Sequence, residues 1–210
     1  MSTSEKIASR LKRMKRGAPI LIEQFRDLGS LTSVQKALSR LAQEGVVERV
    51  YRGIYARPAF VAGMSSIKVA ASAQQIAKKW AQRYGYTIVS QGAESAYRLG
   101  FQTQAPMKIV LWSDGADKTF AVGNQVVEVR NVAESQLRWK SRPAGKFYRA
   151  ISVTPANSVK LNALKDALLS RLNLDETQSL DVIRKLKSVP LPEGWHAKLE
   201  RLESDLRRAV

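Results

Sequence analysis

The sequence predicts an α+β protein, and two stretches of the chain support that prediction. In residues 28–58, Val34, Ala37, Leu38 and Leu41 recur at spacings of three and four, which places them on one apolar stripe of a helix. Gly45 is suited to end that helix in the left-handed conformation. Two β-branched or aromatic runs follow, joined by a turn at Arg52 and Gly53. A helix followed by a hairpin is the layout of a winged helix-turn-helix, so we expect such a domain over residues 1–60.

The second stretch, residues 61–210, mixes strand and helix patterns and predicts a C-terminal α/β domain that ends in helices. We expect the boundary between the two domains at 58–66, where Pro, Gly and Ser are frequent. An amphipathic helix is predicted over 67–84, with Arg83 among its outer residues. The other elements predicted here are strands at 86–90, 108–113, 118–122 and 126–130, and helices at 94–99, 158–172, 180–186 and 193–210.

The predicted N-terminal domain begins with a helix over residues 4–16, for which Ser2, Thr3 or Ser4 can serve as the N-cap. A second short helix is predicted over 20–28. A tight turn at Gly29 and Ser30 then leads into a third helix that begins near Thr32 or Ser33. Basic side chains cluster on the first helix, and they either contact phosphates or form a solvated face at a helix end that favours cations. These residues are Lys6, Arg10, Lys12, Arg13, Lys15 and Arg16.

The third helix and the hairpin supply the candidate DNA contacts. A recognition helix reads base edges from the major groove, and its N-terminal N–H groups can bind a phosphate. A wing reaches a phosphate or the narrow minor groove, and Arg52 at the hairpin tip is the leading wing candidate. Alternatively, Ser33 acts only as an N-cap, and Tyr51 only packs on the sheet edge. The candidate contacts are Ser30, Thr32, Ser33, Gln35, Lys36, Ser39, Arg40, Arg49, Tyr51 and Arg52.

A later segment, residues 130–149, also alternates basic and aromatic residues. Such a segment can bind nucleic acid through charge and ring stacking. The alternative, which we favour, is a half-buried connecting loop with a solvated rim. The residues concerned are Arg130, Arg138, Trp139, Lys140, Arg142, Lys146, Phe147, Tyr148 and Arg149.

Composition restricts the function classes. The formal net charge of +17 and a pI near 10.4 favour nucleic acid as the partner, ahead of an anionic membrane surface or an acidic protein. The chain has no Cys and a single His, which excludes disulfides, thiolate zinc sites and cysteine nucleophiles. No apolar run approaches a membrane span, and the N-terminus is charged where a signal peptide is apolar. We therefore expect a cytoplasmic protein that does not bind membranes.

Catalytic motifs are absent from the sequence. It contains no Walker loop, no GxGxxG and no metal-ligand spacing, so we expect no cofactor, no metal and no enzyme activity. The segment SDGAD holds Asp114 and Asp117, which could suggest a metal or nucleotidyl-transfer site. Asp-Gly after a strand is far more often a turn. His196 has no nucleophile or second His near it in a motif, and we expect a surface or packing role for it.

Two segments carry a family resemblance. VQKALSRLAQEGVVERVYRGIYARP, from Val34 to Pro58, resembles the N-terminal winged-helix domain of the AbiEi antitoxins. QGAESAYRLGFQTQAP, followed by KIVLWSDG, resembles the start of the C-terminal domain of that family, in the same order along the chain. The resemblance covers about the first half of the sequence well and the remainder poorly.

The resemblance implies a sequence-specific transcriptional repressor, the antitoxin of a type IV-like toxin-antitoxin operon. Its expected partners are double-stranded DNA with promoter inverted repeats, bound by cooperating monomers or a weak homodimer, and a nucleotidyltransferase-like toxin. Two alternatives stay open. One is an interaction protein that neutralises the toxin by binding it directly, with DNA binding secondary. The weaker one is a nucleic-acid enzyme with a winged accessory domain.

Overall fold

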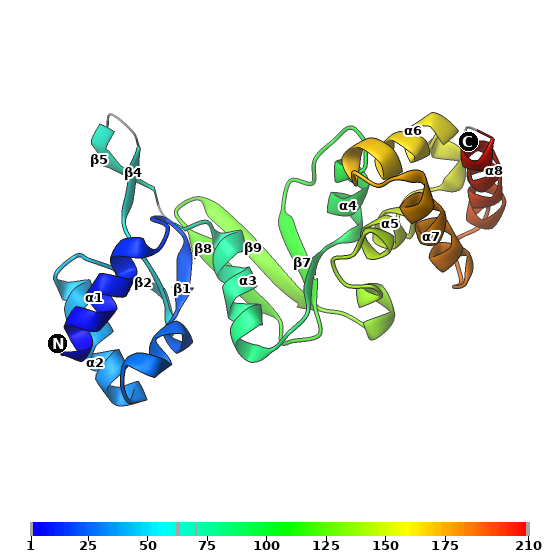
Figure 1. The fold of residues 1–210 in the computed structure, drawn as a ribbon. Coiled ribbons are helices and arrows are strands. Elements are labelled where there is room, and N and C mark those ends of the chain that lie inside the picture. Colours follow the sequence, from blue (N-terminus) through cyan, green and yellow to red (C-terminus); the bar gives the residue numbers. More distant parts are fainter. Residues whose placement is uncertain (1, 62–63, 70, 209–210) are drawn as a thin grey trace. The chain divides into compact units, whose positions relative to one another are not determined.

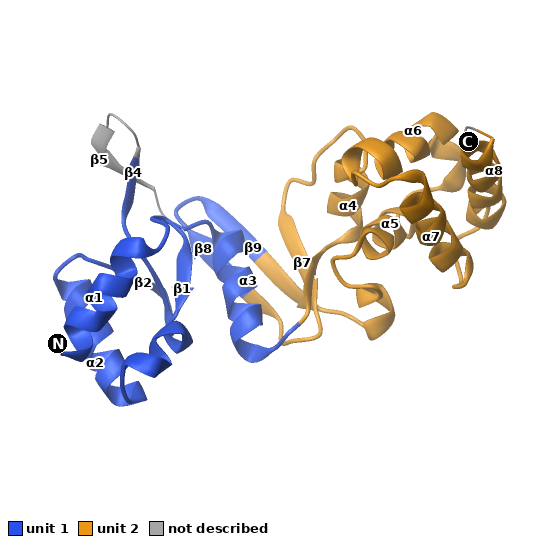
Figure 2. Cartoon of the chain, in the orientation of Figure 1, with its two compact units in different colours: residues 1–86, 119–127 blue, residues 87–118, 128–210 orange. Residues whose placement is uncertain are grey.

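The computed structural model describes residues 2–61, 64–69 and 71–208 and shows an α+β protein (Figure 1). The chain forms two compact units (Figure 2). Unit 1 comprises residues 1–86 and 119–127, and unit 2 comprises residues 87–118 and 128–210. The division between the units differs from the predicted domain boundary at residue 60. A helix and a hairpin tip that follow residue 60 in the sequence pack with the N-terminal elements and so belong to unit 1.

Unit 1 begins with six elements in the order helix, strand, helix, helix, strand, strand. They are α1 (Thr3–Arg13), β1 (Pro19–Leu21), η1 (Ile22–Leu28), α2 (Leu31–Gln43), β2 (Glu48–Tyr51) and β3 (Ile54–Ala56). The three strands form an antiparallel sheet in the order β1-β3-β2, with Ile20 opposite Tyr55 and Arg49 opposite Tyr55 on the other side. Helices α1 and α2 lie side by side (Figure 1).

The local signals predicted α2 and the hairpin well. Val34, Ala37, Leu38 and Leu41 are all buried in the core of this part of the chain, together with Ile7, Leu11 and Phe25. Gly45 has a φ of +73°, as its predicted place after the helix requires. Ser2 caps α1 with Glu5 in a reciprocal capping box.

Three predictions in this part of the chain are wrong in detail. Residues 20 and 21, predicted to begin a helix, belong instead to β1, because pairing with β3 supplies partners for their backbone groups. The helix that follows is a 3₁₀ helix. Helix α2 begins at Leu31, and its N-cap is Ser30, whose Oγ accepts a hydrogen bond from the Ser33 N–H at 3.2 Å. Ser33 is therefore not the cap.

The expected linker and the helix after it also differ from prediction. Residues 59–61 (β4, Ala59–Val61) and 64–69 (β5, Met64–Val69) pair as a two-stranded antiparallel sheet; residues 62 and 63 of the predicted linker lie outside the described residues. Helix α3 (Ala73–Tyr84) starts six residues later than predicted, with Ser72 as its cap. It packs on β1 and β3, and Trp80 contacts Phe120 at the hairpin tip of unit 1, with ring centroids 5.6 Å apart.

Most of the sheet of the second predicted domain follows the predicted strands. Its order is β6-β7-β9-β8, formed by β6 (Ile88–Ser90), β7 (Ile109–Ser113), β8 (Lys118–Val122) and β9 (Gln125–Asn131). A short helix, α4 (Gly92–Arg98), follows β6. The tip of the β8–β9 hairpin belongs to unit 1 and the rest of the sheet to unit 2.

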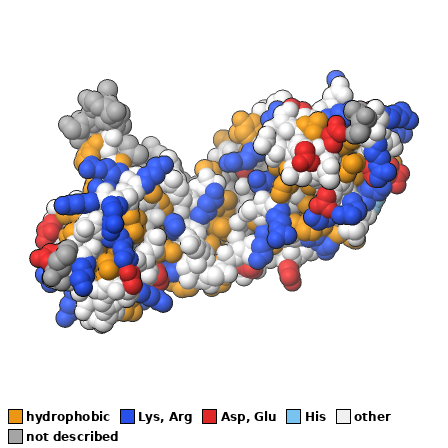
Figure 3. All heavy atoms as spheres, in the orientation of Figure 1, with side chains coloured by type: hydrophobic (Ala, Val, Ile, Leu, Met, Phe, Trp, Pro, Cys, Tyr) orange, Lys and Arg blue, Asp and Glu red, His pale blue; other side chains and the backbone are white. Residues whose placement is uncertain are grey.

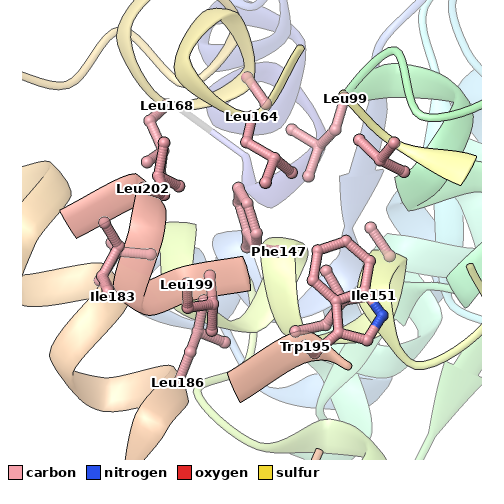
Figure 4. Close-up of a cluster of buried hydrophobic side chains, with 14 of the residues drawn as sticks. Leu99, Phe147, Ile151, Leu164, Leu168, Ile183, Leu186, Trp195, Leu199 and Leu202 are labelled. Atoms are coloured by element: carbon pink, nitrogen blue, oxygen red, sulfur yellow. The ribbon is translucent and has the colours of Figure 1, made fainter. Parts of the chain in front are cut away.

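The remainder of unit 2 is helical. Its elements are η2 (Glu134–Leu137), α5 (Pro143–Ile151), η3 (Ala156–Ser158), α6 (Leu161–Asp166), η4 (Ala167–Arg171), α7 (Glu176–Lys187) and α8 (Trp195–Arg207). The apolar faces of the elements from α5 onward meet in one core, in which Phe147, Leu164, Leu186 and Leu199 point toward one another (Figure 4). Trp195 is fully buried there, and its Nε1–H donates to the Thr154 carbonyl at 2.8 Å. Within the described residues, none of the helices has the length and apolar character needed to cross a membrane.

Candidate nucleic-acid interface

The outward side of α2 is polar and basic. All seven candidates at positions 30–40 are exposed, as is Gln43. The segment from Leu28 to Gln43 contains no Asp or Glu. Within the described part of the chain, neither Lys36 nor Arg40 has an ion pair. The apolar stripe that buries the other side of α2 thus fixes which side chains face solvent.

The β2–β3 turn presents the remaining candidates. Arg49 and Arg52 are exposed, and Gly53 takes a φ of +73°, the left-handed conformation that such a tight turn needs. Tyr51 is half-buried against Phe120, with ring centroids 5.2 Å apart, which agrees with the packing alternative for this residue. The exposed residues of α2 and the turn define what we call the α2–turn surface. They are Ser30, Thr32, Ser33, Gln35, Lys36, Ser39, Arg40, Gln43, Arg49 and Arg52.

A cavity of about 470 Å³ lies between α2 and the turn. Gln35 and Ser39 line it from α2, and Arg49 and Arg52 line it from the turn. The structure therefore brings together side chains that are separated by 10 or more residues in the sequence. Guanidinium and amide groups around one opening can donate several hydrogen bonds to an anionic ligand. The other candidates on α2, Lys36 and Arg40 among them, do not line this cavity.

Arg83 of α3 lines the same cavity, and its role is not evident from the sequence. The side chain, predicted to face outward, is half-buried. Its Nε lies 3.0 Å from the Glu23 carboxylate, and its Nη1 donates to the Arg52 carbonyl at 2.6 Å. The only sequence signal is its place in a basic amphipathic helix, which gives no indication of a partner 31 residues away.

The charge of the molecule is concentrated in unit 1. That unit has 16 Lys and Arg residues against 5 Asp and Glu, whereas unit 2 has 19 against 13. On the face seen in Figure 3, Lys and Arg side chains gather over α1, while over the helices of unit 2 they lie among Asp and Glu. Long-range attraction of a polyanion depends on such uncompensated charge.

One member of the α1 cluster has a structural partner. Arg10 donates to both carboxylate oxygens of Asp27 at 2.6 Å and to the Gln24 carbonyl, which ties α1 to η1. These hydrogen bonds lower the pKa of Asp27. By contrast, Lys12, Arg13, Lys15 and Arg16 are exposed.

The basic and aromatic segment 130–149 does not form one exposed surface, and it is not a connecting loop either. Residues 134–137 and 143–151 are helical. Phe147 lies in the core of unit 2, and Trp139 packs edge-on against Tyr148 at 5.8 Å. Arg149 is 1% exposed; its Nε donates to the Ser90 carbonyl, and burial lowers its pKa to about 10. Phe101, which packs against Phe147, and the Ser90 carbonyl, which accepts from Arg149, are both far away in sequence, so the local pattern did not reveal them.

The two acids of the SDGAD segment accept hydrogen bonds from backbone N–H groups that are distant in sequence. Asp114 accepts from the Thr87 N–H at 2.7 Å, and Asp117 accepts from the Asn131 N–H at 2.5 Å. Among the described residues, no three His, Cys, Asp or Glu side chains gather as a set of metal ligands. His196 is exposed.

These features define an α+β protein whose N-terminal unit exposes an uncompensated basic helix beside a basic turn. The chain belongs to DUF6088, a family of unknown function whose model matches residues 6–170. None of the curated proteins matches it. Among solved structures it is similar to the crystal structure of the RV2827C protein from Mycobacterium tuberculosis, with 15% identity and a TM-score of 0.42. The match covers 96% of this chain and 80% of that chain, and at this level it carries no functional information.

Proposed function

We propose that residues 1–60 form a winged helix-turn-helix that binds double-stranded DNA through the α2–turn surface. The observation that supports this most is the order of elements, α1-β1-η1-α2-β2-β3, together with the antiparallel sheet order β1-β3-β2. In a winged helix this arrangement places the third helix and the hairpin on the DNA side. Helix α2 is then the recognition helix and the β2–β3 turn is the wing.

In this proposal, different groups of the α2–turn surface contact the bases and the phosphate backbone of the DNA. Lys36 and Arg40 lie on the exposed side of α2 and form no ion pair within the described residues, so they can approach bases or phosphates in the major groove. The first-turn N–H groups of α2 have no partners within the helix, apart from the Ser33 N–H that Ser30 caps, and they can bind a phosphate. Arg49 and Arg52 contact the backbone at the adjacent groove.

We further propose that this binding represses transcription, as the resemblance to the AbiEi antitoxins suggests. A protein seated on promoter inverted repeats, as cooperating monomers or a weak homodimer, blocks polymerase by occupancy. In that setting the protein acts in the cytoplasm as the antitoxin of a nucleotidyltransferase-like toxin. No catalytic role is proposed for it.

An electrophoretic mobility shift with the DNA upstream of the protein's own gene tests the proposal. We expect specific binding that Arg40→Ala and Arg52→Ala abolish without lowering the melting temperature, because both side chains are exposed. Each neutralised phosphate releases counterions, so with about six contacts the affinity falls roughly a thousandfold between 50 and 200 mM salt. Unchanged binding of both variants would contradict the docking model.

Co-purification with the product of the neighbouring gene separates this proposal from direct toxin neutralisation. If the protein forms a stable complex with that gene product but binds no promoter DNA, the result favours an interaction protein that neutralises the toxin directly. The third alternative, a nucleic-acid enzyme, is tested by assaying the protein for nucleic-acid-processing activity before and after Asp114→Ala and Asp117→Ala. Loss of such an activity in these variants would favour the enzyme.

A further inference from the structure

The β2–β3 turn is held in place by a residue outside the six N-terminal elements. Arg83 of α3 is bound to two of those elements at once. Its guanidinium forms an ion pair with Glu23 of η1 and donates a hydrogen bond to the carbonyl oxygen of Arg52. A forked, planar guanidinium can bridge two acceptors in this way, whereas an ammonium acts as a single point charge.

Gly53 leaves the space that this contact requires. A Cβ at position 53 would lie 1.8 Å from Arg83 Nη1 and 2.4 Å from Cζ, so only glycine lets the guanidinium lie against the turn. The Gly53 carbonyl in turn accepts from the Ile22 N–H at 3.0 Å. The carbonyl groups of Arg52 and Gly53 are thus both hydrogen-bonded, whereas the Arg52 side chain is exposed.

The fixed turn determines what faces α2. Arg49, Arg52 and Arg83 line one side of the cavity, with Gln35 and Ser39 of α2 among its other lining residues. Arg83 uses its donors on Glu23 and on the Arg52 carbonyl, so it is poorly placed to contact a further ligand itself. Within the described residues, the side chains of Arg49 and Arg52 have no hydrogen-bonding partner and remain free for one.

We propose that Arg83 is a positioning residue for DNA binding. It clamps the Arg52-Gly53 turn to α3 and η1, so that Arg52 and Arg49 are held toward α2 and can engage a backbone phosphate together with it. This inference rests on the proposed function for its DNA-binding part. The clamp itself is a property of the free protein and can be tested without DNA.

Native-state trypsin digestion tests the clamp, because trypsin cleaves after Arg52. We expect Arg83→Ala to speed cleavage at the Arg52–Gly53 bond about tenfold, as for the loss of one charge-assisted hydrogen bond. Mass spectrometry of the fragments identifies the site. Arg83→Lys, which keeps the charge but not the fork, should give an intermediate rate. Lys79→Ala is the matched control: it removes a charge from the same helix, and within the described residues the Lys79 ammonium forms its hydrogen bond with the neighbouring Gln82 side chain and none with the turn.

A double-mutant cycle on promoter DNA tests the positioning role. Arg83→Ala should weaken binding about tenfold in the wild-type background. The Arg52→Ala background is measured at low salt, where its remaining cations still hold duplex DNA. There Arg83→Ala should have almost no effect, because the two changes remove the same contact. The melting temperature of each variant shows whether the fold is retained.

The outcomes are separable. Unchanged cleavage at Arg52 in Arg83→Ala overturns the clamp. Faster cleavage with equal losses of affinity in both backgrounds overturns the positioning role and makes Arg83 an independent contact. If the wild-type protein binds no duplex, the proposed function fails, and the cleavage rates alone decide whether the clamp exists.

Discussion

The two units use their basic side chains differently. In unit 2 many cations are paired: Arg98 with Glu94, Lys165 with Asp205, and both Lys187 and Arg207 with Glu203. On the α2–turn surface of unit 1, Lys36 and Arg40 have no acid partner within the described part of the chain. A net charge of +17 therefore does not locate a binding surface; cations that form no ion pair within the described residues do so better.

Paired and unpaired cations are expected to affect different properties of the protein. Charges that are neutralised within the fold tie elements together, as Arg10 and Asp27 tie α1 to η1. Charges that remain uncompensated attract a polyanion at long range and release counterions when they bind it. Changes to the first kind should alter the melting temperature, and changes to the second kind should alter DNA affinity.

The largest expected effect is on the stability of unit 2. Trp195→Ala removes a fully buried ring and its hydrogen bond to the Thr154 carbonyl, which should cost about 3 to 5 kcal/mol of unfolding free energy. Thermal denaturation should show a melting temperature lower by roughly 10 °C. Trp139→Ala, at a half-buried ring, is the control and should cost clearly less. Equal losses in the two variants would contradict the expectation that burial in the core of Figure 4 sets the cost of losing the ring.

The next effect is on DNA affinity. The triple variant Lys36→Ala, Arg40→Ala and Arg52→Ala removes three uncompensated charges. Specific binding should be lost, and the residual affinity for duplex DNA at 100 mM salt should be at least about a hundredfold below that of the wild type. The control removes three paired charges from unit 2, with Arg98→Ala, Arg184→Ala and Arg207→Ala, and so has the same net charge. The affinity of this control for duplex DNA, measured by fluorescence anisotropy, should change at most about threefold. Equal losses would mean that net charge alone controls binding.

A smaller effect is expected at the buried guanidinium of unit 2. The Arg149 side chain is buried and has no acidic partner among the described residues. Its pKa of about 10 keeps it charged at neutral pH. Replacing an uncompensated buried charge by an apolar group of similar length should stabilise the protein. Arg149→Met should therefore raise the unfolding free energy by about 1 kcal/mol, measured by urea denaturation. A loss of stability would show that the hydrogen bond to the Ser90 carbonyl outweighs the desolvation of the charge.

The smallest effect concerns pH. Because Arg10 lowers the folded-state pKa of Asp27, their interaction stabilises the protein above the ordinary pKa of an aspartate and is lost as the pH falls through the folded-state value. The melting temperature of Arg10→Ala should thus lie below that of the wild type at pH 6, and the gap should narrow toward pH 2. Arg13→Ala, at an exposed residue of the same helix, should show no such pH-dependent gap. A gap that stays constant with pH would contradict the assignment to Asp27.

Local sequence signals predicted α2 and the β2–β3 hairpin because those elements depend on neighbours in the chain. The apolar spacing from Val34 to Leu41 and the glycines at 45 and 53 are sufficient to indicate them. Strand β1 escaped prediction because three residues form a strand only when β3 lies beside them. The start of α3 was placed too early, since residues 64–69 pair with β4 rather than continuing the helical pattern.

The candidate site shows the same limit. The exposed residues of α2 follow directly from its apolar stripe. The roles of Arg83 and Arg149 depend on partners brought together by tertiary packing: the Arg52 carbonyl is 31 residues from Arg83, and the Ser90 carbonyl is 59 residues from Arg149. A basic residue in an amphipathic helix looks the same in sequence whether it faces solvent or clamps a turn.

The central claim, that the α2–turn surface contacts duplex DNA, is tested most directly by amide NMR spectra of the protein titrated with its upstream promoter duplex. We expect the largest chemical-shift changes on residues 30–43 and 49–53, and we expect them to decrease as the salt concentration is raised. Changes concentrated in residues 130–149 or in the helices of unit 2, with the α2–turn surface unaffected, would contradict it.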